Sequence, residues 1–244
     1  MSYQKRFSSA SEVLIYSLLY ENPYSYDSII WKLEQEVLDK IIEEFIPHLR
    51  KKSLLDFACG TGRVLTYLES KFDASYGVDI STNMLRVAEQ RVKKAKLVNA
   101  NLLTSPNLLV GPFDMITAFR FFLNAEQSLR EQALLSLRQR MHRDSILVAN
   151  NHGSYPSLRS LTLRLQRKLR STEINEIKQA DFENMLQKAG FQIVKSFGLA
   201  VLTPTIAKLL GPNITLKCEK LAFLSRISDR LGSNKIYVLK RIND

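Results

Sequence analysis

Short apolar segments and segments of helical periodicity alternate along the middle of the chain. Such alternation predicts parallel strands joined by right-handed crossover helices. The apolar segments have the length and boundaries of buried strands. They lie at residues 53–58, 74–80, 96–100, 113–118 and 145–150, and the helical segments between them at 64–70, 83–94 and 128–141. The pattern therefore predicts an α/β fold.

A long helical region precedes the first predicted strand. Residues 13–50 carry apolar side chains, such as Ile30 and Phe45, in roughly helical spacing. Pro23 and Pro47 interrupt the region. We expect these residues to form helices that pack outside the sheet.

The end of the chain predicts two more strands. A helix at residues 179–189 is closed by Gly190, and apolar segments follow at 192–196 and 235–240. With the five earlier strands they make a seven-stranded sheet. We expect the 235–240 strand to lie antiparallel beside the 192–196 strand.

An insertion at residues 198–234 separates these last two strands. Within it Phe223, Ile227 and Leu231 lie one helical turn apart. This spacing predicts either a small packed helix or a cap over a substrate pocket.

The composition predicts one globular domain without a membrane span. The chain has 244 residues, of which 45% are hydrophobic. The apolar run at residues 13–20 is far shorter than the roughly 18 residues that a span needs. Lys5 and Arg6 precede it as in a signal peptide, but Glu12 interrupts it and no small-residue cleavage site follows. We therefore expect a cytoplasmic protein, and Cys59, which lies in a glycine loop, does not suggest a disulfide framework.

The formal charge is +11, and such a basic surface can attract nucleic acid, an anionic membrane or an acidic small molecule. It can also serve solubility alone. Residues 159–170 are basic without an acid, but Leu158, Leu161, Leu165 and Leu169 form an apolar stripe among them. This stripe indicates a helix with one buried and one solvated face.

A loop rich in small residues follows the first predicted strand. In Asp56-Phe57-Ala58-Cys59-Gly60-Thr61-Gly62, the small residues let the backbone turn sharply and approach a ligand closely. Ligands of such sheets bind beyond the carboxyl ends of the strands, where the strand order reverses. Asp79 ends the second strand, 17 residues after Gly62, and can accept hydrogen bonds from both hydroxyls of a ribose.

A dinucleotide-dependent dehydrogenase can also have a glycine loop followed by an acid. Here, however, the loop has the order Asp-x-Ala-x-Gly-x-Gly in place of Gly-x-Gly-x-x-Gly. Asp56 would repel a pyrophosphate but can bind an ammonium group, and no basic pattern for phosphate follows. These features argue against a dehydrogenase.

Two segments resemble a known family. Residues 54–63, together with Gly77-Val78-Asp79-Ile80-Ser81-Thr82-Asn83-Met84-Leu85, resemble class I S-adenosylmethionine-dependent methyltransferases of the ubiquinone-biosynthesis type. The resemblance implies a Rossmann-like, seven-stranded, mostly parallel sheet with helices on both faces. It implies one domain over residues 1–244, with an N-terminal helical lid (1–50), a cofactor-binding core (51–150) and a substrate-side half (151–244).

The resemblance also assigns the cofactor contacts. Asp56 and the backbone of the glycine loop would surround the methionine part, Asp79 would hold the ribose, and Ile80 and Met84 would flank the adenine. Asn101 stands where the family usually has an acid, and its amide oxygen can still accept a bond from the adenine amino group. The core residues expected to contact S-adenosylmethionine are Asp56, Ala58, Gly60, Gly62, Asp79, Ile80, Met84, Asn101, Leu102 and Phe119.

The N-terminal segment from Tyr16 to Tyr24 is similar to a stretch in bacterial sugar N-methyltransferases of this class, where two tyrosines reach the cofactor from a lid. Tyr16 and Tyr24 match these positions, whereas Ser17 departs from the aspartate usual there. The alternative is that these aromatic residues only pack the lid helix.

Two residues at the predicted strand ends are candidates for catalysis. Because the cofactor already activates the methyl group, the protein mainly aligns the acceptor, and a base is needed only where the acceptor loses a proton. His152 follows the fifth strand and is either such a base or a pocket-lining residue. Arg120 follows the fourth strand and either binds an anionic group of the acceptor or forms a salt bridge.

We expect methyl transfer to an oxygen or nitrogen of a small molecule, such as a glycan precursor or a specialised metabolite. The chain lacks an Asn/Asp-Pro-Pro-Tyr/Phe motif, a Pro-Cys pair and a metal-ligand cluster. Nucleic acid is therefore not the expected partner. The alternatives are an RNA or protein methyltransferase that uses the basic surface, and a non-catalytic cofactor-binding protein. The sequence leaves the oligomeric state open.

Overall fold

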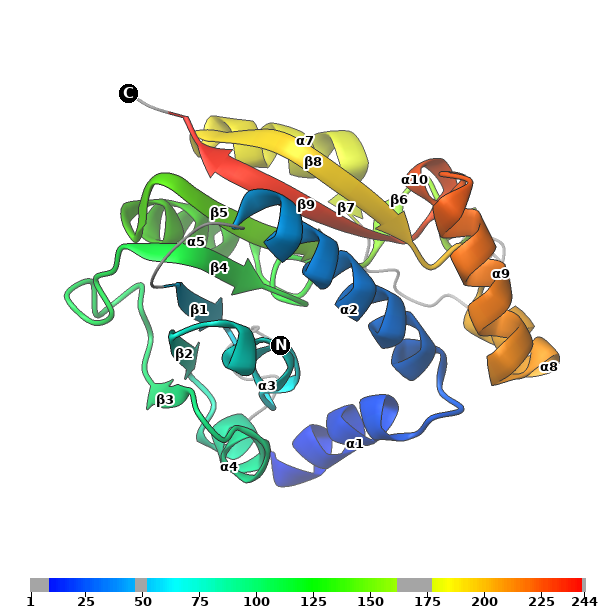
Figure 1. The fold of residues 1–244 in the computed structure, drawn as a ribbon, viewed down its shortest axis with the longest axis horizontal. Helices are drawn as coiled ribbons and strands as arrows, with labels where there is room; N and C mark the ends of the chain where they lie inside the picture. Colours follow the sequence, from blue (N-terminus) through cyan, green and yellow to red (C-terminus); the bar gives the residue numbers. More distant parts are fainter. Residues whose placement is uncertain (1–8, 47–51, 162–176, 243–244) are drawn as a thin grey trace.

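A seven-stranded sheet forms the centre of the molecule (Figure 1). The computed structural model describes residues 9–46, 52–161 and 177–242. β9 runs antiparallel to β5 and β8, and the other pairings are parallel. In sheet order the strands are β3 (Lys96–Asn99), β2 (Ala74–Asp79), β1 (Ser53–Phe57), β4 (Phe113–Ala118), β5 (Met141–Asn151), β9 (Asn234–Arg241) and β8 (Phe191–Leu199). The predicted sheet and its antiparallel strand are confirmed.

Helices cover both faces of this sheet (Figure 1). In chain order they are α1 (Ala10–Glu21), α2 (Tyr26–Phe45), α3 (Arg63–Leu68), the 3-10 helix η2 (Glu69–Lys71), α4 (Thr82–Arg91), α5 (Gln127–Gln139), α7 (Gln179–Lys188), α8 (Pro204–Leu210), α9 (Pro212–Leu224) and α10 (Ser228–Leu231). A two-stranded sheet of β6 (Ser154–Tyr155) and β7 (Ile177–Lys178) lies apart. Within the described ranges, no helix has the length and apolar character needed to cross a membrane.

Successive residues of the central strands face opposite sides of the sheet. Leu54 and Met115 pack with α2 and α3 on one face, whereas Leu55 and Ile116 pack with α5 and α7 on the other. Because helices cover both faces, the strands appear in the sequence as short continuous apolar segments. This is why the sequence pattern located them.

The helix before β5 is shorter than the predicted 128–141. It ends at Gln139 because the buried Arg140 donates hydrogen bonds to four backbone carbonyls and fixes the turn into β5. His142 therefore lies in β5, not at the end of a helix. Its Nε2 lies 3.0 Å from Oδ1 of Asp114.

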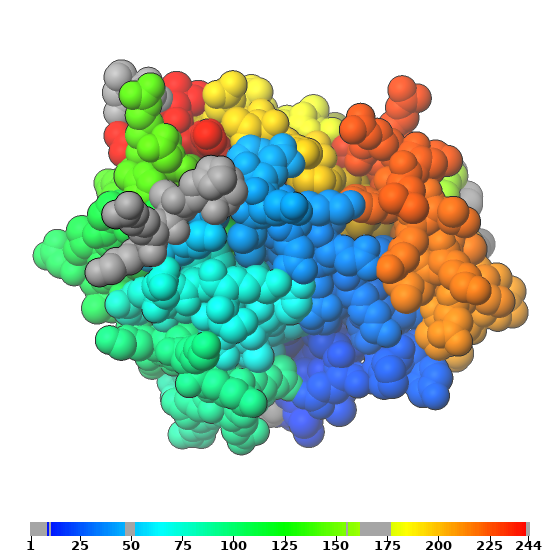
Figure 2. Space-filling view, in the orientation of Figure 1, coloured from blue at the N-terminus to red at the C-terminus, as the bar shows by residue number. Residues whose placement is uncertain are grey.

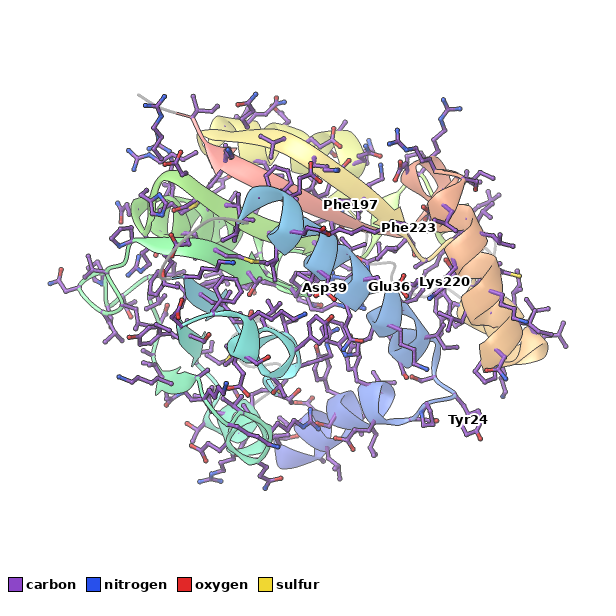
Figure 3. All side chains as sticks on the ribbon, in the orientation of Figure 1. Tyr24, Glu36, Asp39, Phe197, Lys220 and Phe223 are labelled. Atoms are coloured by element: carbon purple, nitrogen blue, oxygen red, sulfur yellow. The ribbon has the colours of Figure 1, made fainter. Side chains whose placement is uncertain are left out.

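The insertion between β8 and β9 forms the three helices α8, α9 and α10, not one. Phe223 lies in α9 and packs against Phe197 of β8, with ring centroids 6.4 Å apart, whereas Leu231 lies in α10 (Figure 3). α8 and α9 protrude at one edge of the molecule, in orange in Figure 2. No residue of these three helices lines the cavities of the candidate site.

Candidate active site

The glycine loop turns sharply between β1 and α3. Ala58, Gly60 and Gly62 have left-handed backbone angles, with φ of 54°, 54° and 76°. At Gly62 a side chain would be strained and crowded, because a Cβ there would lie 3.0 Å from Val92 and 3.1 Å from Ala88. The loop can therefore lie close to the end of α4 only because it carries glycine at this position.

Asp79 fixes the loop at the carboxyl ends of the strands. Its Oδ2 accepts a hydrogen bond from the backbone N–H of Gly60, and its Oδ1 accepts one from that of Ser81, each at 2.8 Å. Burial raises the pKa of Asp79, although these two bonds oppose the increase. Each carboxylate oxygen keeps a second lone pair, so the side chain can still accept bonds from two hydroxyl groups of a ligand.

Asp56 offers a buried oxygen to a ligand. Its Oδ1 accepts a bond of 2.6 Å from the hydroxyl of Thr117, whereas its Oδ2 has no hydrogen-bond partner in the described part of the chain. Burial raises the pKa of Asp56 to about 7. A buried polar atom without a partner is costly, and a cation beside it would remove that cost. The geometry fits the ammonium group expected from the sequence.

A cavity beside the loop brings together most of the predicted site residues. Its walls include Tyr16, Asp56, Ala58, Gly60, Asp79, Ile80, Met84, Phe119 and Arg120. Gly62 is not part of its wall and acts through the shape of the loop. We refer to this space as the cofactor cavity.

An apolar hollow adjoins the cofactor cavity and shares Ala58, Asp79 and Ile80 with it. Leu102 and Asn101 line the hollow, as expected for an adenine site. The Oδ1 of Asn101 already accepts a bond of 3.0 Å from the backbone N–H of Leu103. The amide oxygen expected to bind the adenine therefore also stabilises its own turn.

A second cavity, of about 440 Å³, lies beside α1 and the ends of β4 and β5. We call it the acceptor cavity. It is lined by Glu12, Ile15, Tyr16, Leu19, Tyr20, Asp27, Arg120, Asn124, His152 and Arg159. Three of these residues, Tyr16, Arg120 and Asn124, also line the cofactor cavity. The two cavities therefore meet at these three side chains.

Two arginines with little exposed surface and a fully buried acid lie beside this junction. Glu34 of α2 accepts a bond of 2.8 Å from Arg63 and lies 3.7 Å from Arg120. The guanidinium of Arg63 lies between the rings of Tyr20 and Trp31, 4.3 and 4.1 Å from their centroids. Burial alone would raise the pKa of Glu34, but the charges of Arg63 and Arg120 outweigh it and hold the pKa below its ordinary value. The sequence interpretation missed this cluster.

A chain of hydrogen bonds positions Arg120. Its backbone, with a left-handed φ of 60°, donates to Asn150 at 2.7 Å. Asn150 donates to Asn234 at 3.1 Å, and Asn234 donates to Glu34 at 2.7 Å. The guanidinium comes within 3.5 Å of Asp27, and its Nε has no hydrogen-bond partner among the residues described. The salt-bridge interpretation of Arg120 has support because its guanidinium forms loose ion pairs. The interpretation as an anion-binding residue has support because its Nε keeps donor capacity.

Helix α1, expected from the sequence to form a lid, is tied to the glycine loop through α4. Arg91 of α4 donates to Ser17 of α1 at 3.2 Å and to Thr61 of the loop at 3.3 Å. It also forms an ion pair with Glu21 at the end of α1. The position of α1 is thereby coupled to that of the loop.

Tyr24 does not join the site. It lies in the turn between α1 and α2, where its backbone N–H donates to Asn22, and its side chain is 75% exposed and points away from the protein (Figure 3). A second tyrosine of α1 that lines the acceptor cavity is Tyr20, one helical turn after Tyr16, with ring centroids 5.4 Å apart. The i, i+4 spacing of Tyr16 and Tyr20 could have indicated from the sequence that these two tyrosines share one face of the helix.

His152 lines the acceptor cavity but not the cofactor cavity, so it lies near the junction and not at it. His48 and residues 162–170 of the basic segment lie outside the described part of the chain. Arg159, at the start of that segment, also lines the acceptor cavity. The segment thus contributes at least one cation to the site.

Sequence comparison gives a family match. Residues 30–196 match the model of the family described as methyltransferase domain. A curated protein of Geobacillus sp. (strain WCH70), provisionally named a methyltransferase, is 25% identical over 139 residues, which cover 54% of this chain and 56% of the relative. The match thus spans little more than half the length of that relative.

Solved structures share the fold. Magnesium protoporphyrin IX methyltransferase of Synechocystis PCC 6803, with bound SAH, is 17% identical with a TM-score of 0.68, covering 98% of this chain and 97% of that chain. The plantazolicin methyltransferase BamL, in complex with a triazolic desmethylPZN analogue and SAH, is 14% identical with a TM-score of 0.63, covering 99% of this chain and 94% of that chain. The [4+2]-cyclase SpnF is 15% identical with a TM-score of 0.56, covering 86% and 81%. The fold therefore hosts more than one kind of reaction.

Proposed function

The chain belongs to the methyltransferase domain family, and on this basis we propose that it transfers a methyl group from S-adenosylmethionine to an oxygen or nitrogen of a small molecule held in the acceptor cavity. The observation that carries the proposal is the junction itself. Tyr16, Arg120 and Asn124 line both cavities, so a group held in one can meet a group held in the other.

The residues of the cofactor cavity fit S-adenosylmethionine. When bound, this cofactor supplies a methyl group activated by its sulfonium centre. Asp56, with its unpartnered Oδ2, would hold the ammonium group, and Arg63, which lines the same cavity, would hold the carboxylate. Asp79 would accept from the ribose hydroxyls, and the hollow beside Leu102 would hold the adenine.

The acceptor cavity suits a small molecule. Its volume of about 440 Å³ lies in the range of small-molecule sites. Ile15 and Leu19 provide apolar wall, and Arg120 and Arg159 provide cations for an anionic group of the acceptor. An extended macromolecule would have to enter this space with one residue or base only.

His152 is the candidate general base. It lies on the acceptor side, where it can take the proton that a hydroxyl or amine loses on methylation. Arg120 positions the acceptor, and α1 excludes water from the junction. This assigns His152 to proton transfer and Arg120 to binding.

Transfer of labelled methyl groups to fractionated cell extracts tests the proposal. We expect label in small molecules, and not in RNA or protein. Label in RNA or protein would support the alternative in which the basic surface binds a macromolecule. Cofactor binding without transfer to any fraction would support a non-catalytic protein.

Variants of His152 and Arg120 test the assigned roles once an acceptor is found. His152→Gln should lower kcat ~100-fold or more with cofactor affinity unchanged. Arg120→Lys should mainly raise the KM for the acceptor, because lysine lacks the bidentate geometry. His142→Gln is the matched control, since His142 bonds Asp114 and lines neither cavity. Equal loss in the His142 and His152 variants would exclude the base.

A further inference from the structure

The helices between β8 and β9 expose an unusual number of aliphatic side chains. Leu209, Leu224 and Leu221 are 87%, 72% and 67% exposed. The full set of large exposed apolar residues there is Ile206, Leu209, Ile214, Leu221, Leu224, Ile227 and Leu231. We call this set, with the basic residues among it, the 206–231 surface. Apolar patches of this kind mark interaction sites.

The aliphatic residues of α9 form a single stripe. Ile214, Leu221 and Leu224 recur at helical spacing, and the exposed Lys217 lies on the same side of the helix. On α8, Ile206 and Leu209 are three residues apart and both are exposed. The stripe belongs to α9, which lies at the edge of the molecule shown in orange in Figure 2.

The opposite side of α9 is fixed to the protein. Glu219 accepts hydrogen bonds from the hydroxyl of Tyr26 at 2.7 Å and from the backbone of Val201 and Leu202 at 3.1 and 2.8 Å. Lys220 pairs with Glu36 of α2 at 2.6 Å (Figure 3). The exposed stripe therefore cannot turn inward without breaking these bonds.

The charge of the segment itself is positive, although the partly exposed Glu36 of α2 neutralises Lys220. Between residues 200 and 231 the basic side chains are Lys208, Lys217, Lys220, Arg226 and Arg230. The two acids of this segment face inward, because Glu219 is 1% exposed and the half-buried Asp229 accepts from the backbone of Gly198 at 3.0 Å. Among residues 200–231, all of which are described, no acidic side chain is exposed.

We propose that the 206–231 surface docks the protein onto an anionic lipid bilayer. Exposed leucine and isoleucine side chains can enter the acyl boundary, while the lysines and arginines beside them bind anionic headgroups. Protein interfaces concentrate their binding energy in tryptophan, tyrosine and arginine, with leucine under-represented. No aromatic residue of this segment is exposed, since Phe223 packs on Phe197. The composition therefore favours a membrane over a protein partner.

Vesicle sedimentation tests this docking. We expect the full chain to sediment with phosphatidylcholine vesicles that contain phosphatidylglycerol, and to bind pure phosphatidylcholine vesicles and high-salt samples much more weakly. The double variant Leu209→Glu/Leu221→Glu should reduce vesicle binding ~10-fold or more. Leu135→Glu is the matched control, because Leu135 is 54% exposed on α5, outside this surface. This variant should bind vesicles as the unsubstituted chain does.

The double variant should keep the affinity for S-adenosylmethionine, because neither leucine lines a cavity of the site. Vesicle binding that the double variant retains would overturn the proposal. So would a failure of the unsubstituted chain to bind anionic vesicles. In that case, self-association in analytical ultracentrifugation that the double variant abolishes would assign the surface to contact between two copies of the chain.

Discussion

Replacing Asp56 by asparagine should have opposite effects on stability and on cofactor binding. Burial raises the pKa of this carboxyl from an ordinary 3.8 to about 7. Such a difference corresponds to ~4 kcal/mol. Because the folded protein keeps this proton to a higher pH than the unfolded chain, its free energy of unfolding falls as the pH rises through this window.

The asparagine variant is free of this pH-dependent loss. Its amide oxygen can still accept the bond from Thr117, but its buried NH₂ group lacks a partner, which costs ~1–3 kcal/mol. The cofactor-free variant should therefore be more stable than the unsubstituted protein at pH 7.5 by ~1–3 kcal/mol. The gain should vanish or reverse near pH 4, where the carboxyl is protonated in the folded state.

Binding should change in the other direction. Without the carboxylate, the ammonium group of S-adenosylmethionine loses a charge-assisted bond, which weakens binding at pH 7.5 by ~1.5–3 kcal/mol, or ~10-fold to 150-fold in Kd. The affinity of the unsubstituted protein should rise between pH 5.5 and 7.5, whereas that of the variant should change less. Urea unfolding and calorimetric titration measure the two effects.

Asp114→Asn is the control with the opposite sign. Hydrogen bonds from Ser53 and His142 overcome the effect of burial and hold the pKa of Asp114 below its ordinary value. Its contribution to stability is therefore present at neutral pH and lost on acidification, and the substitution should destabilise the protein at pH 7.5. An Asp56→Asn protein that is less stable than the unsubstituted protein at pH 7.5, or that binds the cofactor equally well, would refute the reasoning.

Three further substitutions test other contacts of the site. Glu34→Ala removes the buried acid of Arg63, leaves Arg120 with Asp27 as its one acid among the described residues, and should lower the free energy of unfolding in urea by ~3–5 kcal/mol. Glu36→Ala, which breaks an exposed pair, should cost less than ~1 kcal/mol; similar losses would mean that the cluster is not a buried ion network. Asp79→Ala should weaken S-adenosylmethionine binding by ~1.5–3 kcal/mol in calorimetry, and an unchanged Kd would remove its ribose role. Arg91→Met should release α1, raise the Kd of the cofactor ~2–5-fold and speed proteolysis at the turn before α2; slower or equal cleavage would show that Arg91 does not hold the lid.

The sequence predicted those features that short segments determine. The central strands β1, β4 and β5 were identified because they are apolar segments buried along most of their length, and Phe113–Ala118 was located to the residue. The glycine loop was identified because its small residues and Asp56 lie together in the sequence. Helix ends were less certain, since a distant contact sets them, as the bonds of Arg140 show.

Features built from distant residues were missed. Glu34, Arg63 and Arg120 lie on different elements and meet only through the packing of α2 on the sheet. The expectation for Tyr24 rested on resemblance, while the exposure of this residue depends on the direction of the turn after α1. The regular spacing from Phe223 to Leu231 did not reveal that the chain starts a new helix between them.

The position of the transferable methyl group tests the central claim most directly. In a crystal structure with bound S-adenosylmethionine, we expect the sulfonium methyl group at the junction of the two cavities, facing Tyr16, Arg120 and Asn124, with the adenine in the hollow beside Leu102. A methyl group that faces away from these three residues would contradict the assignment of the acceptor cavity, and a cofactor bound elsewhere on the sheet would contradict the assignment of both cavities.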